Sequence, residues 1–231
     1  TFPLPSEPPA ERPGRVAVMV QGDSLTGEII RPDGSKITLA GRRAPALTRE
    51  GQPVWGETID LLAEGMAAWR PRSTGPNGWK FREGELANTT PSVDLLTREA
   101  FTDFILHVEV NVPPSGNSGI YLRGRHEVQV ADDYGKEPHS RRMGGIYGQV
   151  TPRSLPALPA GEWQTLDITL IGRRVRVVLN GATIIEDVEI PGITGGALDS
   201  DEGAAGPIML QGDHTAVRYR NIRITPARSM D

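Results

Sequence analysis

Most of the chain alternates between apolar and polar residues with the period of two that is typical of β-strands. The clearest case is residues 104–111, with the sequence FILHVEVN. Residues 163–190 contain further strands that are separated at Gly172 and at Asn180-Gly181, a dipeptide favoured in two-residue hairpin turns. Shorter strands are predicted within residues 15–23, 25–34 and 35–41, where Gly-Asp and Pro-Asp-Gly mark the turns.

Only residues 58–69, TIDLLAEGMAAW, are a candidate for a helix, and Gly65 weakens that prediction. Many short strands with Gly and Pro turns predict an all-β fold, a two-sheet antiparallel β-sandwich with at most one short helix. The alternation assigns these side chains to the space between the sheets: Leu166, Ile168, Leu170, Val175, Val177 and Leu179. We expect three regions, a Pro-rich arm (residues 1–13), a β-hairpin extension (14–56) and the sandwich domain (57–231).

One predicted strand places polar side chains where a site would need them. If residues 117–132, NSGIYLRGRHEVQVAD, form a single strand, apolar residues alternate with a polar stripe on the opposite face. The stripe consists of Tyr121, Arg123, Arg125, Glu127 and Gln129. Such a stripe is either a solvated surface or a functional site, and alternation alone does not decide between them.

Composition excludes several classes of partner and chemistry. The net charge of −4 and the pI of about 5.7 give no basic surface for nucleic acid or for an anionic membrane. No stretch approaches the roughly 18 apolar residues of a membrane-spanning helix. The chain has no cysteine, which excludes disulfides, thiolate catalysis and cysteine-ligated zinc. It begins with Thr1, as a chain does after removal of a leader or after trimming.

An ordered series of motifs carries a family resemblance. The motifs are LLTREAFTDFILHVEVNVPPSGNSGIYLRGRHEVQVADDYG, GGIYGQVTP, PAGEWQTLDITLIGRRVRVVLNGATII and GPIMLQGDHTAVRYRNIRI. Over about residues 57 to 226 the chain closely resembles the 3-keto-disaccharide hydrolase family. The resemblance implies a concanavalin-like jelly roll of the lectin and glucanase type, found in exported bacterial proteins, and therefore a periplasmic or extracellular location. It also implies cleavage of the glycosidic bond of 3-keto-glycosides or 3-keto-disaccharides.

The implied chemistry indicates what the site must contain. A ketone at carbon 3 acidifies the proton on carbon 2, so that a base can remove it and the enolate can expel the group on carbon 1. Water then adds to the product. This route needs a base, donors for the enolate oxygen and an acid for the leaving oxygen.

We assign the catalytic roles first. Glu127 is the candidate base, and Arg123, expected on the same strand face, would stabilise the enolate or keep Glu127 ionised. Asp132 and His139, in the loop that follows, are the candidate acids.

The substrate-binding candidates complete the set. On the strand these are Tyr121 and Gln129, together with Asn117, which matches the family's Asn-Ser-Gly. Tyr147 matches the motif GGIYG, and Gln211 and His214 belong to the motif LQGDH.

Two other functions fit the same fold. Laminarinase-type glucanases carry Glu-x-Asp-x-x-Glu on one strand, and Glu127, Gln129 and Asp132 occupy those offsets here. Because the middle residue is an amide, the double-displacement route is in doubt. A non-catalytic carbohydrate-binding module is the third interpretation, although the stripe offers only one aromatic ring, Tyr121.

No cofactor is expected, and a small carbohydrate is the expected ligand. The acidic pairs in residues 132–133 and 198–203 would suit calcium, but neither has the spacing of an EF-hand. The sequence leaves open the sugar, its anomeric configuration and the oligomeric state.

Overall fold

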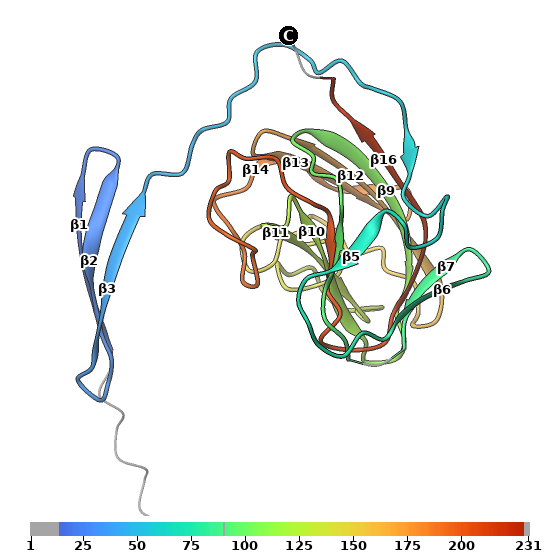
Figure 1. The fold of residues 1–231 in the computed structure, drawn as a ribbon, viewed down its shortest axis with the longest axis horizontal. Coiled ribbons are helices and arrows are strands. Elements are labelled where there is room, and N and C mark those ends of the chain that lie inside the picture. The colour runs from blue at the N-terminus through green and yellow to red at the C-terminus, as the bar shows by residue number, and fades with distance from the viewer. Residues whose placement is uncertain (1–13, 90, 229–231) are drawn as a thin grey trace, which may run out of the picture. The chain divides into compact units, whose positions relative to one another are not determined.

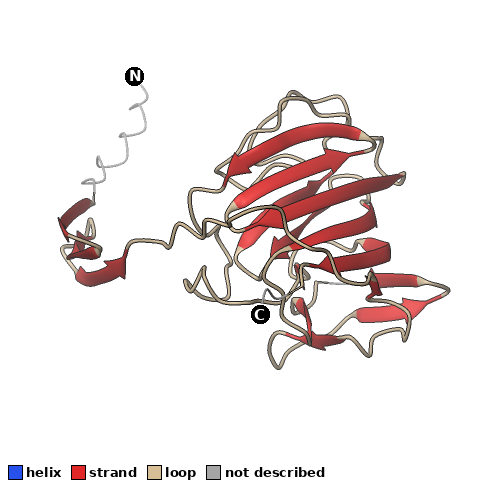
Figure 2. Ribbon diagram, turned by 90° about the horizontal axis from the view of Figure 1, so that it is seen from above, coloured by secondary structure: helices blue, strands red, loops and turns tan. Residues whose placement is uncertain are grey.

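The computed structural model of the chain describes residues 14–89 and 91–228, so the predicted arm, residues 1–13, lies outside the described residues. The chain divides after Pro45 into two compact units. Strands and loops make up both units, and the described residues contain no helix (Figures 1 and 2). No helix of these residues is therefore available to cross a membrane.

The helix predicted in residues 58–69 is wrong. A short strand, β4 (Ile59–Asp60), is followed by successive turns and then by β5 (Trp69–Pro71). Gly65 has a φ of +64°, a left-handed conformation that a right-handed helix cannot continue through. The segment therefore closes as separate turns, in which Gly65 N donates to Leu62 O and Trp69 N donates to Met66 O.

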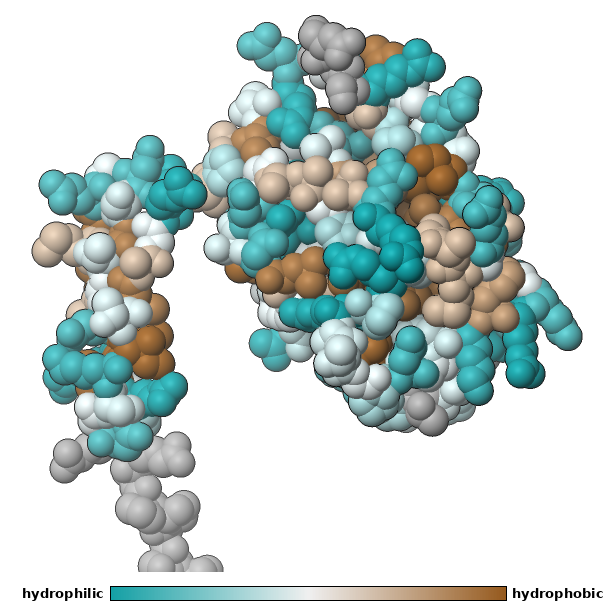
Figure 3. All heavy atoms as spheres, viewed as in Figure 1, coloured by the Kyte–Doolittle hydropathy of each residue, from teal (hydrophilic) through white to brown (hydrophobic). Residues whose placement is uncertain are grey.

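The first unit is a three-stranded antiparallel sheet of β1 (Arg15–Gln21), β2 (Ser24–Ile30) and β3 (Lys36–Arg42), in that order. The register places Val16 opposite Ile29, and Ile29 opposite Ile37, so apolar side chains share one face. Several of them are exposed, among them Val16 at 64% and Val20 at 61%. Figure 3 shows hydrophobic residues at the surface of this sheet.

The second unit contains two antiparallel sheets. The larger sheet has the order β14-β13-β12-β9-β16-β7-β6, with β4 also paired to β16, and the smaller has the order β11-β10-β15-β8-β5. The bounds not yet given are β6 (Trp79–Arg82), β7 (Glu85–Asn88), β8 (Leu95–Thr97), β9 (Phe104–Asn111), β10 (Asn117–Leu122), β11 (His126–Ala131), β12 (Trp163–Ile171), β13 (Arg174–Leu179), β14 (Ala182–Glu189), β15 (Met209–Leu210) and β16 (Arg218–Pro226).

The apolar faces of the two sheets form one core. Leu166, Ile168 and Leu170 of β12 are fully buried, as are the inward residues of β13 that the alternation identified. They share the core with Ile120 and Val128 of the smaller sheet. Each large side chain buried in this way stabilises the fold by roughly 1.5–3 kcal/mol. The predicted all-β antiparallel sandwich is confirmed.

Candidate active site

The polar stripe lies on a hairpin, so the prediction of a single strand is wrong. Strands β10 and β11 are joined through Arg123 and Gly124, whose φ angles of +51° and +65° are those of a type I′ turn. Arg125 N donates to Leu122 O and closes the turn. Because Tyr121 pairs with Glu127, the two side chains still share a face, on adjacent strands.

Arg123 and Arg125 leave the stripe at this turn. Arg123 is completely buried, and its Nη2 donates to Gly172 O at 2.6 Å. Burial lowers the pKa of Arg123 to about 10. Arg125 forms a two-point ion pair with Asp199, at 2.7 and 3.1 Å. The expectation that Arg123 lies beside Glu127 is therefore wrong, because its guanidinium is bound to the carbonyl of Gly172, between β12 and β13.

Glu127 is a buried carboxyl group with few partners. It is 5% exposed, and the Tyr121 hydroxyl lies 3.0 Å from its Oε2 and 2.9 Å from Gly195 O, either of which can accept the hydroxyl proton. Glu127 N donates to Thr194 Oγ1 at 2.9 Å. Burial raises the pKa of Glu127 to about 7, although the hydrogen bond from Tyr121 acts in the opposite direction.

A glycine makes room for this carboxyl group. A Cβ atom added at Gly119 would lie 2.5 Å from Glu127 Oε1 and 3.0 Å from its Cδ. The side chain of Glu127 therefore leans from β11 across β10. Any other residue at position 119 would have to displace it.

The strand register extends a row of polar residues across the smaller sheet. Gly119 pairs with Gln129, and Gln211 N donates to Gly119 O at 2.9 Å. The pairing of Leu210 with Leu95 sets Gln211 beside Asp94, and Arg72 N donates to Asp94 O. We call this the polar row, which consists of Gln129, Gly119, Gln211, Asp94 and Arg72.

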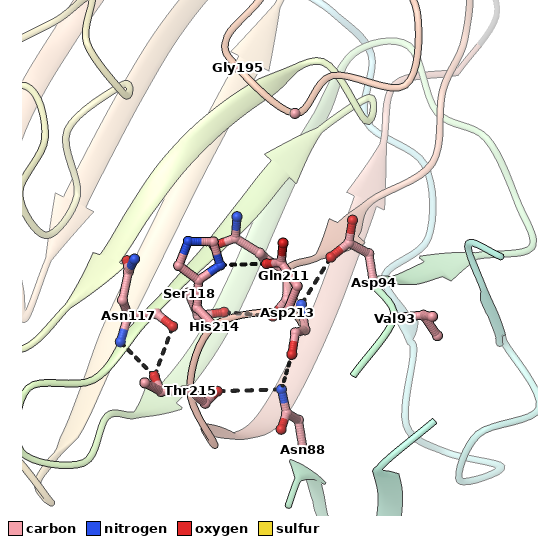
Figure 4. A network of polar contacts seen from close by, with 12 residues as sticks. Asn88, Val93, Asp94, Asn117, Ser118, Gly195, Gln211, Asp213, His214 and Thr215 are labelled. Atoms are coloured by element: carbon pink, nitrogen blue, oxygen red, sulfur yellow. Dashed lines mark hydrogen bonds and ion pairs between the residues drawn. The ribbon is translucent and has the colours of Figure 1, made fainter. Parts of the chain in front are cut away.

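Amide groups next to the row are available to a ligand. Gln129 Nε2 donates to Asn117 Oδ1 at 2.9 Å, and Asn117 N donates to Thr215 Oγ1 at 2.7 Å. Figure 4 shows Asn117 beside Thr215, with Gln211 close by. Neither Asn117 Nδ2 nor the side-chain amide of Gln211 makes a hydrogen bond within residues 14–89 and 91–228.

The turn after β15 adds charged groups. His214 Nδ1 contacts Asp213 Oδ1, and both side chains are exposed (Figure 4). The charge of His214 lowers the pKa of Glu127, whereas the charges of Asp213 and Asp94 raise it. All three charges therefore lie within electrostatic range of the Glu127 carboxyl group. Gln211 thus lies at the end of the strand next to Gly119, over which the carboxyl group of Glu127 lies, and His214 follows in the turn after it.

Asp132 and His139 take part in local contacts. Asp132 Oδ2 accepts a hydrogen bond from Ser115 N, and His139 Nδ1 accepts one from Arg141 N. No hydrogen bond or ion pair links either residue to Glu127 in the part of the chain that the structure describes. Five positions along a strand correspond to about 16 Å, and an odd separation reverses the face. Glu127 and Asp132 are therefore badly placed for the 5–5.5 Å of a retaining carboxyl pair.

Tyr147 lies at the edge of the site. Its backbone N donates to Glu127 O at 2.9 Å, and the Arg141 guanidinium lies 5.6 Å from the centre of its ring. The segment around Tyr147 extends the smaller sheet beyond β11, because Gly144 N also donates to Gln129 O.

Several groups at this site were not predicted from the sequence. Thr194 and Gly195 contact Glu127 and Tyr121 from a Gly-rich loop, and Asp94 and Arg72 lie at the ends of the distant strands β8 and β5. The glycines of residues 191–196 are a sequence signal that could have indicated a close approach of the backbone.

A hollow of about 470 Å³ adjoins the end of the polar row. Asp94 and Asp213, whose charges act on Glu127, both line it. The complete lining is Arg72, Ser73, Pro76, Pro91, Ser92, Val93, Asp94 and Asp213. Among the described residues, no three His, Asp or Glu side chains gather as metal ligands would. The suggestion of calcium stays a prediction.

Comparison with known proteins identifies a family that matches the chain and solved structures with a similar fold. A model of the 3-keto-alpha-glucoside-1,2-lyase-like domain matches residues 57–225. A crystal structure from Parabacteroides distasonis, described as a "putative glycosyl hydrolase", is 28% identical, with a TM-score of 0.64 over 77% of this chain and 92% of that one. A second structure from the same organism, with the same description, is 19% identical, with a TM-score of 0.61 over 74% and 94%. No curated protein sequence matches the chain significantly.

Proposed function

The chain belongs to the family of 3-keto-alpha-glucoside-1,2-lyase-like domains, and we propose that it cleaves the glycosidic bond of a sugar oxidised to a ketone at carbon 3. Membership supports a carbohydrate-active role, which the likeness to glycosyl hydrolase structures also favours. Our proposal goes beyond this general role in two respects: the substrate carries a ketone at carbon 3, and the bond is cleaved by elimination.

The proposed reaction has two stages. In the first, a base takes the proton from carbon 2, and the electrons of that bond form an enolate with the carbon 3 ketone. The enolate then expels the group on carbon 1, whose oxygen leaves with the bonding electrons and takes up a proton. In the second, water adds across the carbon 1–carbon 2 double bond of the product.

The observation that carries the proposal is the position and acidity of Glu127. A carboxylate with a pKa of about 7 is a stronger base than an ordinary glutamate, yet it is ionised in about half the molecules at neutral pH. It lies over Gly119, which is hydrogen-bonded to Gln211 through the backbone. The side-chain amide of Gln211 and Asn117 Nδ2, which make no hydrogen bond with the described residues, would donate to the sugar oxygens.

We assign the role of the acid to His214. Its imidazole is exposed, is paired with Asp213 and carries a charge that acts on Glu127. In this proposal His214 protonates the leaving oxygen, the role first assigned to Asp132 and His139. Arg123 takes no part, because it is buried at the hairpin turn.

The pH dependence of the reaction follows from Glu127. Only the ionised form can accept the proton, so kcat/KM on a 3-keto-glycoside is expected to rise with pH through about 7 and then level off. Steady-state rates between about pH 5 and pH 9 measure this. A rate that rises instead near pH 4 would contradict a base of raised pKa.

Product analysis in deuterated water tests the proposed function. With 3-keto-trehalose or a 3-keto-glucoside, NMR is expected to show deuterium on carbon 2 of the released sugar, because water returns that hydrogen. Release of sugar without deuterium would refute the elimination route. Absence of any product, with calorimetric binding of an unoxidised glucan, would indicate a binding module.

A further inference from the structure

We propose that Gly195, Gly196 and Ala197 form a lid over Glu127, which the Tyr121 hydroxyl latches while Glu127 is protonated and releases when Glu127 is ionised. The latch is a property of the folded chain. Only its use, which is to admit substrate to an ionised base, rests on the proposed function.

The loop after β14 lies directly on the buried pair of Tyr121 and Glu127. These two residues are 2% and 5% exposed, whereas Gly195 and Gly196 of the loop are exposed. A Cβ atom added at Gly196 would lie 2.5 Å from Tyr121 Oη, so the loop backbone contacts the hydroxyl group. A general base has to come within about 2.6–3.2 Å of the atom whose proton it removes. The loop therefore has to move before Glu127 can act on a sugar.

The loop is fixed at two points on the hairpin of β10 and β11. At the first, Thr194 is buried, its N donates to Arg125 O at 2.9 Å and its Oγ1 accepts a hydrogen bond from Glu127 N. At the second, Leu198 N donates to Gly124 O at 2.9 Å. Any opening motion is thus confined to the three residues between these points.

Those three residues are the lid, and two side chains hold it. The Tyr121 hydroxyl lies 2.9 Å from Gly195 O, and Arg72 Nη1 donates to Gly196 O at 3.2 Å. Figure 4 marks Gly195 on this loop. A Cβ atom added at Gly195 would meet nothing within 4 Å, and Gly196 has a φ of +80°. Two glycines in succession let the lid backbone change conformation at little cost.

The Tyr121 hydroxyl has one proton for two acceptors. Its Oη lies 3.0 Å from Glu127 Oε2 and 2.9 Å from Gly195 O. An ionised carboxylate is the stronger acceptor and takes this proton, which leaves Gly195 O without its donor. A protonated carboxyl group can instead donate to Tyr121 Oη, so the hydroxyl proton turns to Gly195 O. Burial raises the pKa of Tyr121, so the hydroxyl keeps its proton throughout.

Ionisation of Glu127 therefore creates the base and loosens the lid in one step. Burial raises the pKa of Glu127 to about 7, so the lid is latched below this pH and released above it. The loss of one hydrogen bond raises the ratio of open to closed lid by about fivefold. On the elements around Glu127, the other charged or titratable groups are Tyr121, Arg72, Asp94, Asp213, His214, Arg141, Tyr147, and Arg125 with its partner Asp199.

Methyl NMR without substrate tests the latch. The methyl group of Ala197 is attached to Cα, so its order parameter follows the lid backbone. From about pH 5 to about pH 9 this order parameter is expected to fall by about a third, the difference between a rigid and a mobile segment, with a midpoint at about 7. The Thr194 methyl group, at a fixed point of the loop, should show no change.

Two variants isolate the hydroxyl and the carboxyl group. Tyr121→Phe removes the hydroxyl but keeps the ring in its buried cluster with Leu96 and Met209, and its lid is expected to be mobile at both pH values. Glu127→Gln cannot be ionised, so its Ala197 order parameter is expected to be the same at both.

His214→Gln is the matched control, because histidine is the other side chain that changes charge near neutral pH. The loosening of the lid should persist in this variant. Since the charge of His214 lowers the pKa of Glu127, the midpoint should move to higher pH.

Three results would overturn the inference: a constant Ala197 order parameter in wild type, a change that persists in Glu127→Gln, or a Tyr121→Phe lid as rigid as that of wild type at acidic pH. A change that both variants abolish and His214→Gln retains supports the latch. None of these measurements needs turnover. The deuterium experiment can therefore refute the proposed function while the latch stands, and loss of the latch leaves the proposed function intact.

Discussion

Glu127→Gln is expected to lower the turnover of a 3-keto-glycoside by about 10²–10⁴-fold, the usual contribution of a general base. The amide has the same shape and can still accept the hydrogen bond from Tyr121, but it cannot take the proton from carbon 2. Steady-state kinetics on the purified variant, with deuterium incorporation as a second readout, measure the loss. Turnover within about threefold of wild type would remove Glu127 from the mechanism.

Stability provides the control for this variant. The pKa of Glu127 is raised in the folded chain, so its contribution to stability is present below the unfolded value near 4.5 and is lost as the pH rises through about 7. Glu127→Gln should therefore unfold at no lower temperature than wild type at about pH 8. If the variant were inactive and also less stable than wild type at this pH, its loss of activity could result from unfolding and would give no information on the role of Glu127 as a base.

Arg123→Met is the matched comparison on the same hairpin. It removes a buried guanidinium without touching Glu127, and the flexible Met side chain can fill much of the space that the Arg side chain occupied. Its turnover is expected to stay within about threefold of wild type, whereas a loss as large as that of Glu127→Gln would reinstate Arg123 as a catalytic candidate.

Gly119→Ala is expected to reduce turnover by about 10²-fold without unfolding the chain. The added methyl group would lie 2.5 Å from Glu127 Oε1, so the carboxyl group must move, and a displacement of about 1 Å is enough for a loss of this size. The displaced group should also be better solvated. Its pKa should then fall, and the rise of kcat/KM should shift to lower pH.

The control for Gly119→Ala is Gly41→Ala on β3, where the new methyl group would meet only Leu25, at an ordinary distance of 3.9 Å. That variant is expected to retain wild-type rates. If Gly119→Ala also retained full activity and an unchanged pH profile, the carboxyl group would not need its position over β10, and the geometry proposed for the base would be wrong.

The sequence identified the residues that share a face with Glu127, although it predicted one strand where the structure has a hairpin of two. Three residues, 123–125, separate Leu122 from its partner His126, so the odd-numbered residues on both sides of the turn still share a face. Tyr121, Glu127 and Gln129 were therefore grouped correctly, although they lie on two strands. Arg-Gly is not a dipeptide that marks a type I′ turn, and for this reason Arg123 and Arg125 were placed on the stripe.

The sequence by itself determined the all-β sandwich and many of its buried residues, because alternation and turn residues are local patterns that the backbone geometry converts into strands. The family followed from the resemblance of its motifs, which the match over residues 57–225 confirms. Only the tertiary structure decided the partners of Glu127. The Tyr121 hydroxyl and the Thr194 hydroxyl contact it, and the strand order β11-β10-β15-β8-β5 brings Gln211 and Asp94, from segments far apart along the chain, to the same sheet. Its raised pKa is likewise a tertiary property, since burial under distant segments removes the water that would stabilise the carboxylate.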